Sequence, residues 1–438
     1  MANDLELAYK AITGKQARHN LAWAYYLGDH PLVYANERLQ NIFSGEVKFT
    51  ENWCAVVIDA LKERIDLTGF TVPETAQPVL DEIYQRNSLS IESDDLHEAA
   101  LVTGEAYLII WPDELNYPEI YFNDPRLVHA FYQAERPREM RFAAKMWTDD
   151  EGFARMVLYY SDRLEYYKST KKAENVTNAN AFEVDEETAP GGVAENPYGQ
   201  IPVFHFRTRR QAISEIADVI PIQNGVNKLL TDMMVAAEYG AFRQRWVISN
   251  SDTTALKNAP NEIWNIPAGD GIGQQTLVGE FNATDLGNYL DSISHLAGDI
   301  GRITRIPKHY FYSQSGDPSG EALIAMEAPL SHKATDRIER FEVTWKQAMM
   351  LALEMSGQKV PMDEIEPVFR SVHTVQPKTE AEIRYYNKQA GLPLVTTLRR
   401  EGWTDAELED MEADRQTEQA AASALGDNLL DNFEKGAE

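Results

Sequence analysis

Two long stretches with helical spacing of apolar residues flank a stretch that lacks it, and this arrangement limits the possible folds more than any single motif. Residues 221–242 begin with Pro221, which suits the first turn of a helix, and carry one apolar stripe. Residues 283–306 carry a second apolar stripe at helical intervals. The residues between them, 243–282, contain short strand-like pieces separated by Asn, Pro and Gly. The sequence therefore predicts two long helices joined by a small insertion that contains strands.

A loop and a third long helix follow this pair. Residues 307–317 are predicted to form the loop. Asp317 as N-cap and Pro318 at the first helical position predict the start of a helix over 318–356. We expect this helix to kink at Pro329, because a proline ring does not fit a regular helix interior.

Residues 1–220 are predicted to contain helices followed by strands. Helical spacing occurs near the N-terminus and in the segment NWCAVVIDALKERI (52–65). Runs rich in β-branched and aromatic residues then alternate with turn residues from Glu105 to Lys168, which predicts an antiparallel meander. The run at 201–207 is expected to close this sheet, and the polar residues 171–200 are expected to form a surface loop. The predicted fold class is α+β.

Composition and charge exclude several classes of protein. The chain has 438 residues, 43% of them hydrophobic, and a formal net charge of −28. This acidity argues against tight binding of nucleic acid through neutralised phosphates, which needs clustered Lys and Arg. No window approaches the ~18–20 apolar residues of a membrane-spanning helix, and the N-terminus lacks the pattern of a secretory signal. A single cysteine, Cys54, excludes an intrachain disulfide.

Motifs for catalysis, cofactors and metals are missing from the sequence. Gly14-Lys15 is followed by Gln16, so it is not a phosphate-binding P-loop. The histidines show no H-x-x-x-H pair, and no G-x-S-x-G nucleophile motif is present. We therefore expect no catalytic, cofactor-binding or metal-binding residues, and a chain that is not an enzyme. One catalytic alternative stays open, a carboxylate-dependent hydrolase that uses acids such as Asp113 or Asp124.

Several sequence blocks, taken in their order, resemble the portal proteins of tailed double-stranded DNA bacteriophages, in particular the siphophage-type portal family. Together they extend from about residue 20 to residue 355. The blocks are YYLGDHPL (25–32), NWCAVVIDALKERIDLTGF (52–70), LHEAALVTGEAYLIIWPD (96–113), NDPRLVHAFY (123–132), NPYGQIPVFHFRTR (196–209), SEIADVIPIQNGVNKLLTDMMVAAEYGAFRQRW (214–246) and IPKHYFYSQSGDPSGEAL (306–323).

The resemblance implies a portal fold with an α/β wing, a two-helix stem, a small α/β clip, a long kinked helix and a helical crown. The implied division of the chain is wing 1–220, first stem helix 221–242, clip 243–282, second stem helix 283–306, channel loop 307–317, long kinked wing helix 318–356, and crown with an acidic tail 357–438.

The resemblance also implies a location and a set of partners. Copies of the chain are expected to form a dodecameric ring at one capsid vertex of the virion, after assembly in the host cytoplasm. Double-stranded DNA would pass through this head–tail connector during packaging and ejection without being tightly bound. The implied partners are further copies of the chain, the large terminase subunit, a head–tail adaptor, and the major capsid and scaffolding proteins; no membrane is implied. A ring-shaped adaptor that binds only protein is the alternative from another class.

Three groups of residues are the candidate sites under this interpretation. The residues expected to face DNA in the channel loop are Lys308, His309, Tyr310, Phe311 and Tyr312. The residues expected at the subunit interface of the stem are Leu229, Met233, Leu290, Ile293 and Leu296. The residues expected in the clip are Arg243 and Arg245. Segment 221–306 has nine acidic and six basic side chains, so its wall would be only weakly negative and would let DNA slide. The substitution Ile293→Asp is expected to prevent ring assembly.

Overall fold

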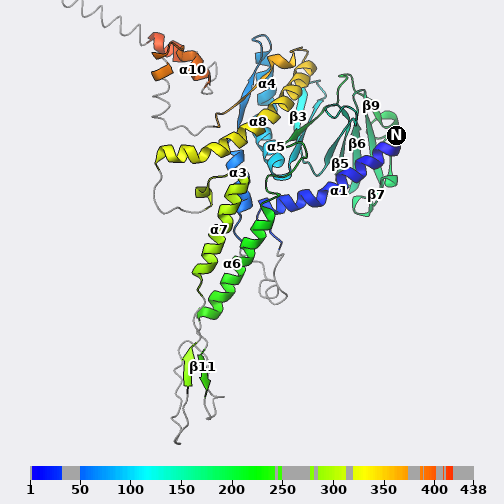
Figure 1. The fold of residues 1–438 in the computed structure, drawn as a ribbon. Helices are drawn as coiled ribbons and strands as arrows, with labels where there is room; N and C mark the ends of the chain where they lie inside the picture. Colours follow the sequence, from blue (N-terminus) through cyan, green and yellow to red (C-terminus); the bar gives the residue numbers. More distant parts are fainter. Residues whose placement is uncertain are drawn as a thin grey trace, which may run out of the picture. The chain divides into compact units, whose positions relative to one another are not determined.

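The computed structural model describes residues 2–31, 50–241, 245–248, 277–280, 285–311, 319–372, 385–387, 389–400, 408 and 411–417. The chain divides into two compact units, and its helices and strands are drawn in Figure 1. The first unit consists of Met1–Lys62, Asp95–Ile109 and Tyr121–Asp317, and the second of Glu63–Asp94, Ile110–Ile120 and Pro318–Glu438.

Helices and strands are mixed along the chain, as the α+β class predicts. The α-helices are α1 (Ala2–Tyr26), α3 (Trp53–Lys62), α4 (Gln77–Arg86), α5 (Leu89–Thr103), α6 (Ile220–Ala241), α7 (Gly287–Thr304), α8 (Gly320–Met355) and α10 (Leu394–Arg400). The strands are β1 (Leu67–Thr71), β2 (Glu105–Pro112), β3 (Pro118–Asn123), β4 (Val128–Tyr132), β5 (Met140–Thr148), β6 (Phe153–Tyr159), β7 (Arg163–Lys172), β8 (Phe182–Val184), β9 (Val193–Glu195), β10 (Val203–Arg207), β11 (Arg245–Ile248), β12 (Leu277–Glu280) and β13 (Glu366–Phe369).

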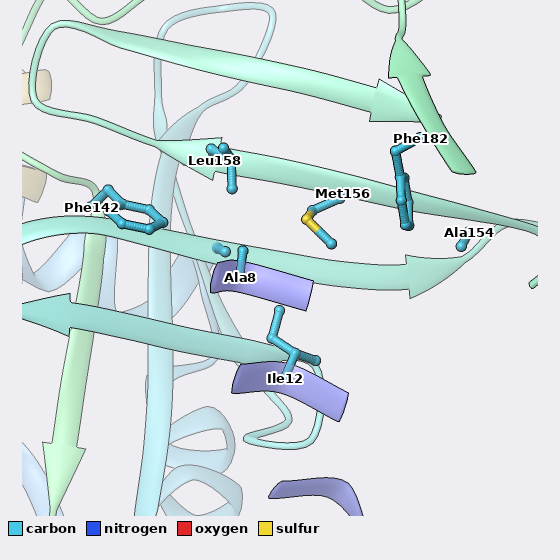
Figure 2. Close-up of a cluster of buried hydrophobic side chains, with 8 residues drawn as sticks. Ala8, Ile12, Phe142, Ala154, Met156, Leu158 and Phe182 are labelled. Atoms are coloured by element: carbon cyan, nitrogen blue, oxygen red, sulfur yellow. The ribbon is translucent and has the colours of Figure 1, made fainter. Parts of the chain in front are cut away.

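The largest sheet lies in the first unit and has the antiparallel order β4-β5-β6-β7-β8, with β9 also paired to β7. One face of this sheet packs against α1. Ala8 and Ile12 of α1 are fully buried and lie against Phe142 of β5 and Met156 of β6, among other side chains of the same cluster (Figure 2). This is the expected result of alternation, because every second residue of a strand points to the same face.

Three expectations about this sheet are wrong. The first two strands of the predicted meander, β2 and β3, are not part of it. The residues at 201–207 do not close the meander, because β10 pairs antiparallel with β2 in a separate three-stranded sheet of order β10-β2-β3. The polar residues 171–200 are not only a loop, because they contain β8 and β9, which pair with β7. Strands of three residues are too short to show a period in sequence, and pairing with β7 decides their conformation.

The second unit is built around α8. Trp345 of α8 is fully buried and meets Phe70 of β1 at 5.8 Å between ring centroids. Strand β1 pairs antiparallel with β13, although the two strands are separated by most of the chain.

The predicted start of α8 is wrong by a few residues. Ser319 is the N-cap, and its hydroxyl accepts a hydrogen bond from the amide of Ala322. Asp317 and Pro318 lie outside the described residues. The extended backbone of Ser319 brings its short side chain to the amide that needs an acceptor, so the helix begins at Gly320. The helix then continues through Pro329 to Met355.

Candidate functional site: the helix pair and the turn that follows it

Helices α6 and α7 are the elements that occupy the two predicted long helical stretches, and they run side by side (Figure 1). The buried face of α7 consists of Ile293, Ala297, Ile300, Gly301 and Thr304. Residues spaced three and four apart fall on one side of a helix, so this face is continuous.

The two helices approach each other closely at Gly225 of α6. A methyl group added at Gly225 would lie 3.6 Å from the Cδ1 atom of Leu296, an ordinary van der Waals contact. Leu296 of α7 therefore faces Gly225 with space left for a methyl group, and the two helices form a hairpin within one chain.

The predicted stem-interface residues fall into three groups in the structure. Ile293 is only 6% exposed and is buried by its own chain. Leu229, Met233 and Leu296 are half-buried. Leu290 is 54% exposed, which leaves it available to another molecule.

Further apolar side chains on this part of the chain are exposed. Met234 of α6 is 42% exposed and Ile303 of α7 is 52% exposed. The ribbon formed by β11 and β12 exposes Ile248 by 61% and Val278 by 54%. Of the predicted clip residues, Arg245 begins β11 in register with Glu280, and Arg243 lies outside the described residues.

The turn after α7 is firmly anchored. Arg305 has a φ angle of 64°, in the left-handed region, and the amide of Ile306 donates to the carbonyl of Gly301 at 3.1 Å. This is the bond of a Schellman motif, which closes a helix C-terminus. Ile306 is 3% exposed, and Phe311 is 7% exposed.

Phe311 is held by an aromatic contact inside the first unit. Its ring meets that of Trp53, the first residue of α3, edge to face, with centroids 6.2 Å apart. Of the other predicted channel residues, Lys308 is exposed, His309 and Tyr310 are half-buried, and Tyr312 lies outside the described residues. Phe311 thus acts as an anchor of the turn rather than as an exposed residue.

A chain of hydrogen bonds joins α3, α6 and the end of α1. The amide of Trp53 donates to Oε1 of Gln223 at 3.0 Å, and Nε2 of Gln223 donates to Oδ1 of Asn227 at 3.0 Å. Nδ2 of Asn227 donates to Nδ1 of His30 at 2.9 Å, and Nε2 of His30 donates to the carbonyl of Tyr25 at 3.0 Å. Because a backbone amide begins the chain and a backbone carbonyl ends it, the orientation of each side-chain amide and the tautomer of His30 are determined.

This hydrogen-bonded chain was not among the predicted sites, although part of it leaves a signal in the sequence. Gln223, Asn227 and Thr231 are spaced four residues apart and form a buried polar row along α6. Polar side chains on a buried helical face need partners. The partners, Trp53 and His30, lie in distant parts of the sequence, so the row alone does not identify them.

Some of the cationic side chains of the helix pair form ion pairs. Lys228 pairs with Asp232, and Arg302 pairs with Asp299. Arg305 and Lys308 are exposed, and within the described part of the chain neither has an ion-pair partner.

A second cluster, of buried ionisable groups, ties α1 to the sheets. Nζ of Lys15 lies 2.8 Å from Oε1 of Glu105, and Nε2 of His205 lies 2.9 Å from Oε2 of the same carboxylate. Tyr107 also donates to Glu105, at 2.9 Å. Although burial opposes it, these partners hold the pKa of Glu105 well below its usual range. The cluster is a largely buried link between elements.

The two acids of the hydrolase alternative have structural partners. Asp113 accepts from the amides of Leu115 and Tyr117 and pairs with Arg86 at 2.8 Å. Asp124 accepts from Nε of Arg126 at 2.8 Å. Within the described ranges, no group of three or more His, Cys, Asp or Glu side chains could hold a metal ion. No described helix has both the length and the apolar character needed to cross a membrane.

A comparison with known protein families identifies a match over most of the chain. A family model described as phage portal protein, SPP1 Gp6-like, matches residues 18–421 of the 438 residues. No curated protein matches the sequence. The family match includes α6, α7 and the turn after α7, together with both compact units.

Proposed function

The chain belongs to the family of SPP1 Gp6-like phage portal proteins, and from that premise we propose that it forms a dodecameric ring at one capsid vertex of a bacteriophage. The ring is the conduit through which double-stranded DNA is packaged and ejected. In this proposal α6 and α7 are the stem, the β11–β12 ribbon belongs to the clip, and residues 307–317 form the channel loop. Residues 357–438 form the crown, of which the structure describes only parts.

The observation that carries the proposal is the incomplete burial of the helix pair. Within one chain, the helix pair buries one face of α7. It leaves the apolar side chains of Met234, Leu290 and Ile303 exposed. A neighbouring copy that covers these side chains would remove their apolar surface from water, which favours association. In a ring, one surface of each copy meets a different, complementary surface of the next copy, and the assembly closes when the rotation between neighbouring copies divides a full turn evenly.

The charge of the helix pair suits a conduit that does not hold DNA. Each phosphate neutralised by a fixed cation adds salt-dependent affinity, and many such contacts would stall the duplex. The ion pairs of Lys228 and Arg302 cancel their charges for a passing phosphate. This leaves few cations to slow the DNA.

The proposal includes partners and excludes catalysis. The clip would face the large terminase subunit during packaging and the head–tail adaptor afterwards, and the wing would contact the capsid and scaffolding proteins. ATP hydrolysis would belong to the terminase, since this sequence has no P-loop. The engagement of Asp113 and Asp124 in a turn and in ion pairs favours this proposal over the hydrolase alternative.

Electron microscopy of the purified chain tests the proposed function. We expect class averages along the ring axis to show a closed ring with twelve-fold symmetry and a channel that admits duplex DNA. A ring whose channel is too narrow for a duplex would instead support the protein-only adaptor. Nuclease or ATPase activity that co-purifies with the chain and disappears in the Asp113→Asn or Asp124→Asn variant would support the hydrolase.

A further inference from the structure

Arg305 occupies a backbone conformation that its residue type does not favour. The residue after α7 has a φ angle of 64°, and this left-handed position at a helix C-terminus is usually taken by glycine. Apart from the glycines, only three other described residues, Ser88, Asn116 and Ala212, have a positive φ angle. An arginine at this position therefore has a cost that a glycine would avoid.

The side chain of Arg305 is exposed although its neighbours along the turn are buried. Along the turn, Thr304, Ile306, Pro307 and Phe311 are buried, whereas Arg305 and Lys308 are exposed. The buried residues and the Schellman hydrogen bond fix the backbone conformation of the turn. The exposed side chains of Arg305 and Lys308 therefore start from fixed backbone positions.

Arg305 and Lys308 also differ from the cations of the helices. Arg302, one turn earlier, is paired with Asp299, and Lys228 is paired with Asp232. Among the residues that the structure describes, Arg305 and Lys308 have no carboxylate partner, so their charges are available to an external anion.

We propose that Arg305 is a phosphate-contacting residue of the conduit and that, with Lys308, it touches the backbone of duplex DNA as the duplex passes the turn after α7. This inference rests on the proposed function. An arginine fork makes two parallel hydrogen bonds to a phosphate, and an exposed, unpaired cation can release the phosphate again. One such pair of cationic side chains in each copy of the chain would give a ring of evenly spaced, transient phosphate contacts.

A structural role for Arg305 predicts different behaviour. A cation near a helix C-terminus is favoured by the helix dipole, so Arg305 could serve only to end α7. In that case the Arg305→Gly variant, which relieves the left-handed conformation, should perform as well as the wild type. If Arg305 contacts phosphate, the same variant should form rings with undiminished thermal stability and lose affinity for DNA.

The experiment measures binding of a short DNA duplex to purified rings as a function of salt concentration, starting at low salt where weak contacts are measurable. The slope of log K against log salt changes by roughly 0.9 for each phosphate contact that is lost. We expect Arg305→Gly and the neutral Arg305→Asn, whose residue also tolerates the left-handed region, to reduce the slope by at least that amount. Arg305→Lys should retain most of the slope, and Arg302→Gln, which removes a paired cation, should retain all of it.

The outcomes separate this inference from the proposed function. If rings of Arg305→Gly and Arg305→Asn bind duplex DNA with the wild-type affinity and the wild-type slope of log K against log salt, the role of Arg305 is overturned. That result would not contradict the proposed conduit. A wild-type chain that forms no ring, or a ring that does not admit duplex, would overturn both. A reduced slope in both neutral variants, with the Arg302→Gln variant unchanged, supports the inference.

Discussion

At the scale of single residues, the direction of a hydrogen bond matters as much as its presence. Gln223 accepts from a backbone amide on one side and donates on the other, so neither glutamate nor a hydrophobic residue can replace it without loss. Trp53, which begins this chain of bonds, also packs against Phe311. The same residues therefore join the base of α6 to the turn that presents Arg305.

We predict that Gln223→Glu lowers the free energy of unfolding by at least about 2 kcal/mol. The carboxylate can still accept from Trp53 but cannot donate to Oδ1 of Asn227, and burial adds the cost of an unpaired charge. Urea denaturation measures the change. Gln85→Glu, at an exposed position of α4, is the control and should stay within about 0.5 kcal/mol of the wild type. Equal stability of the two variants would show that the hydrogen-bonded chain is not important.

Acid should destabilise the fold through the buried His19 and the half-buried His129. Burial lowers the pKa of both His19 and His129 from 6.5 to about 4. In the unfolded chain these histidines take up protons near pH 6.5, whereas in the folded chain they stay neutral until about pH 4. The unfolded state therefore binds more protons in this window, and stability falls as the pH is lowered from 6.5 towards 4.

We predict that His129→Phe removes part of this acid sensitivity. Phenylalanine keeps an aromatic contact with Phe131, which meets the His129 ring at 4.7 Å, and it cannot titrate. The loss of unfolding free energy between pH 7 and pH 4 should shrink by roughly 2–3 kcal/mol, because one pKa unit corresponds to about 1.4 kcal/mol. His295→Gln, at a side chain 75% exposed, is the matched control at an exposed histidine. A His129→Phe profile that parallels the wild type would argue against the depressed pKa.

At the scale of elements, the long helices and the longer strands were predictable from local patterns. The helix expected over 221–242 is α6, the strand runs between Glu105 and Lys168 are β2 to β7, and residues 52–65 contain α3. The short strands β8 and β9 and the pairing of β10 with β2 were not predictable, since they depend on which edge is available in three dimensions.

Two glycines of the helix pair should respond in opposite ways to alanine. We predict that Gly225→Ala raises the unfolding free energy by about 0.5–1 kcal/mol, because the added methyl meets Leu296 at an ordinary distance and helical glycine is entropically costly. Gly301→Ala should give no gain or a loss, because its methyl would lie 3.0 Å from the carbonyl oxygen of Ile306 and 3.5 Å from the Phe311 ring. Thermal unfolding of the two variants side by side measures this, and an equal gain in both would contradict the close fit of the turn.

At the scale of the whole molecule, the structure changes which residue best tests assembly. Ile293→Asp would place a charge on the buried face of α7 and would damage the hairpin itself, so loss of rings in that variant would be uninformative. Leu290 lies on the same helix and is 54% exposed, so a charge there leaves the chain intact.

We predict that Leu290→Asp folds with near wild-type stability and fails to form rings, because neighbouring copies would have to bury the new carboxylate. Negative-stain microscopy and sedimentation velocity measure the assembly, and thermal unfolding measures the fold. Leu115→Asp, at a leucine 74% exposed in the turn between β2 and β3, is the matched control and should form rings. Intact Leu290→Asp rings would remove Leu290 from the subunit interface.

The sequence by itself determined the class of the fold, the order of the long elements and the family, because periodic burial and the order of blocks are properties of the chain read in one dimension. Only the tertiary structure decided that Ile293 is an internal residue, that Phe311 anchors the turn against Trp53, and that Gln223 joins α6 to the start of α3. It also showed that Arg302 forms an ion pair with Asp299 and that Arg305 has a left-handed backbone conformation and an exposed side chain. These properties depend on which distant residues come within a few ångströms, and no spacing along the chain specifies that.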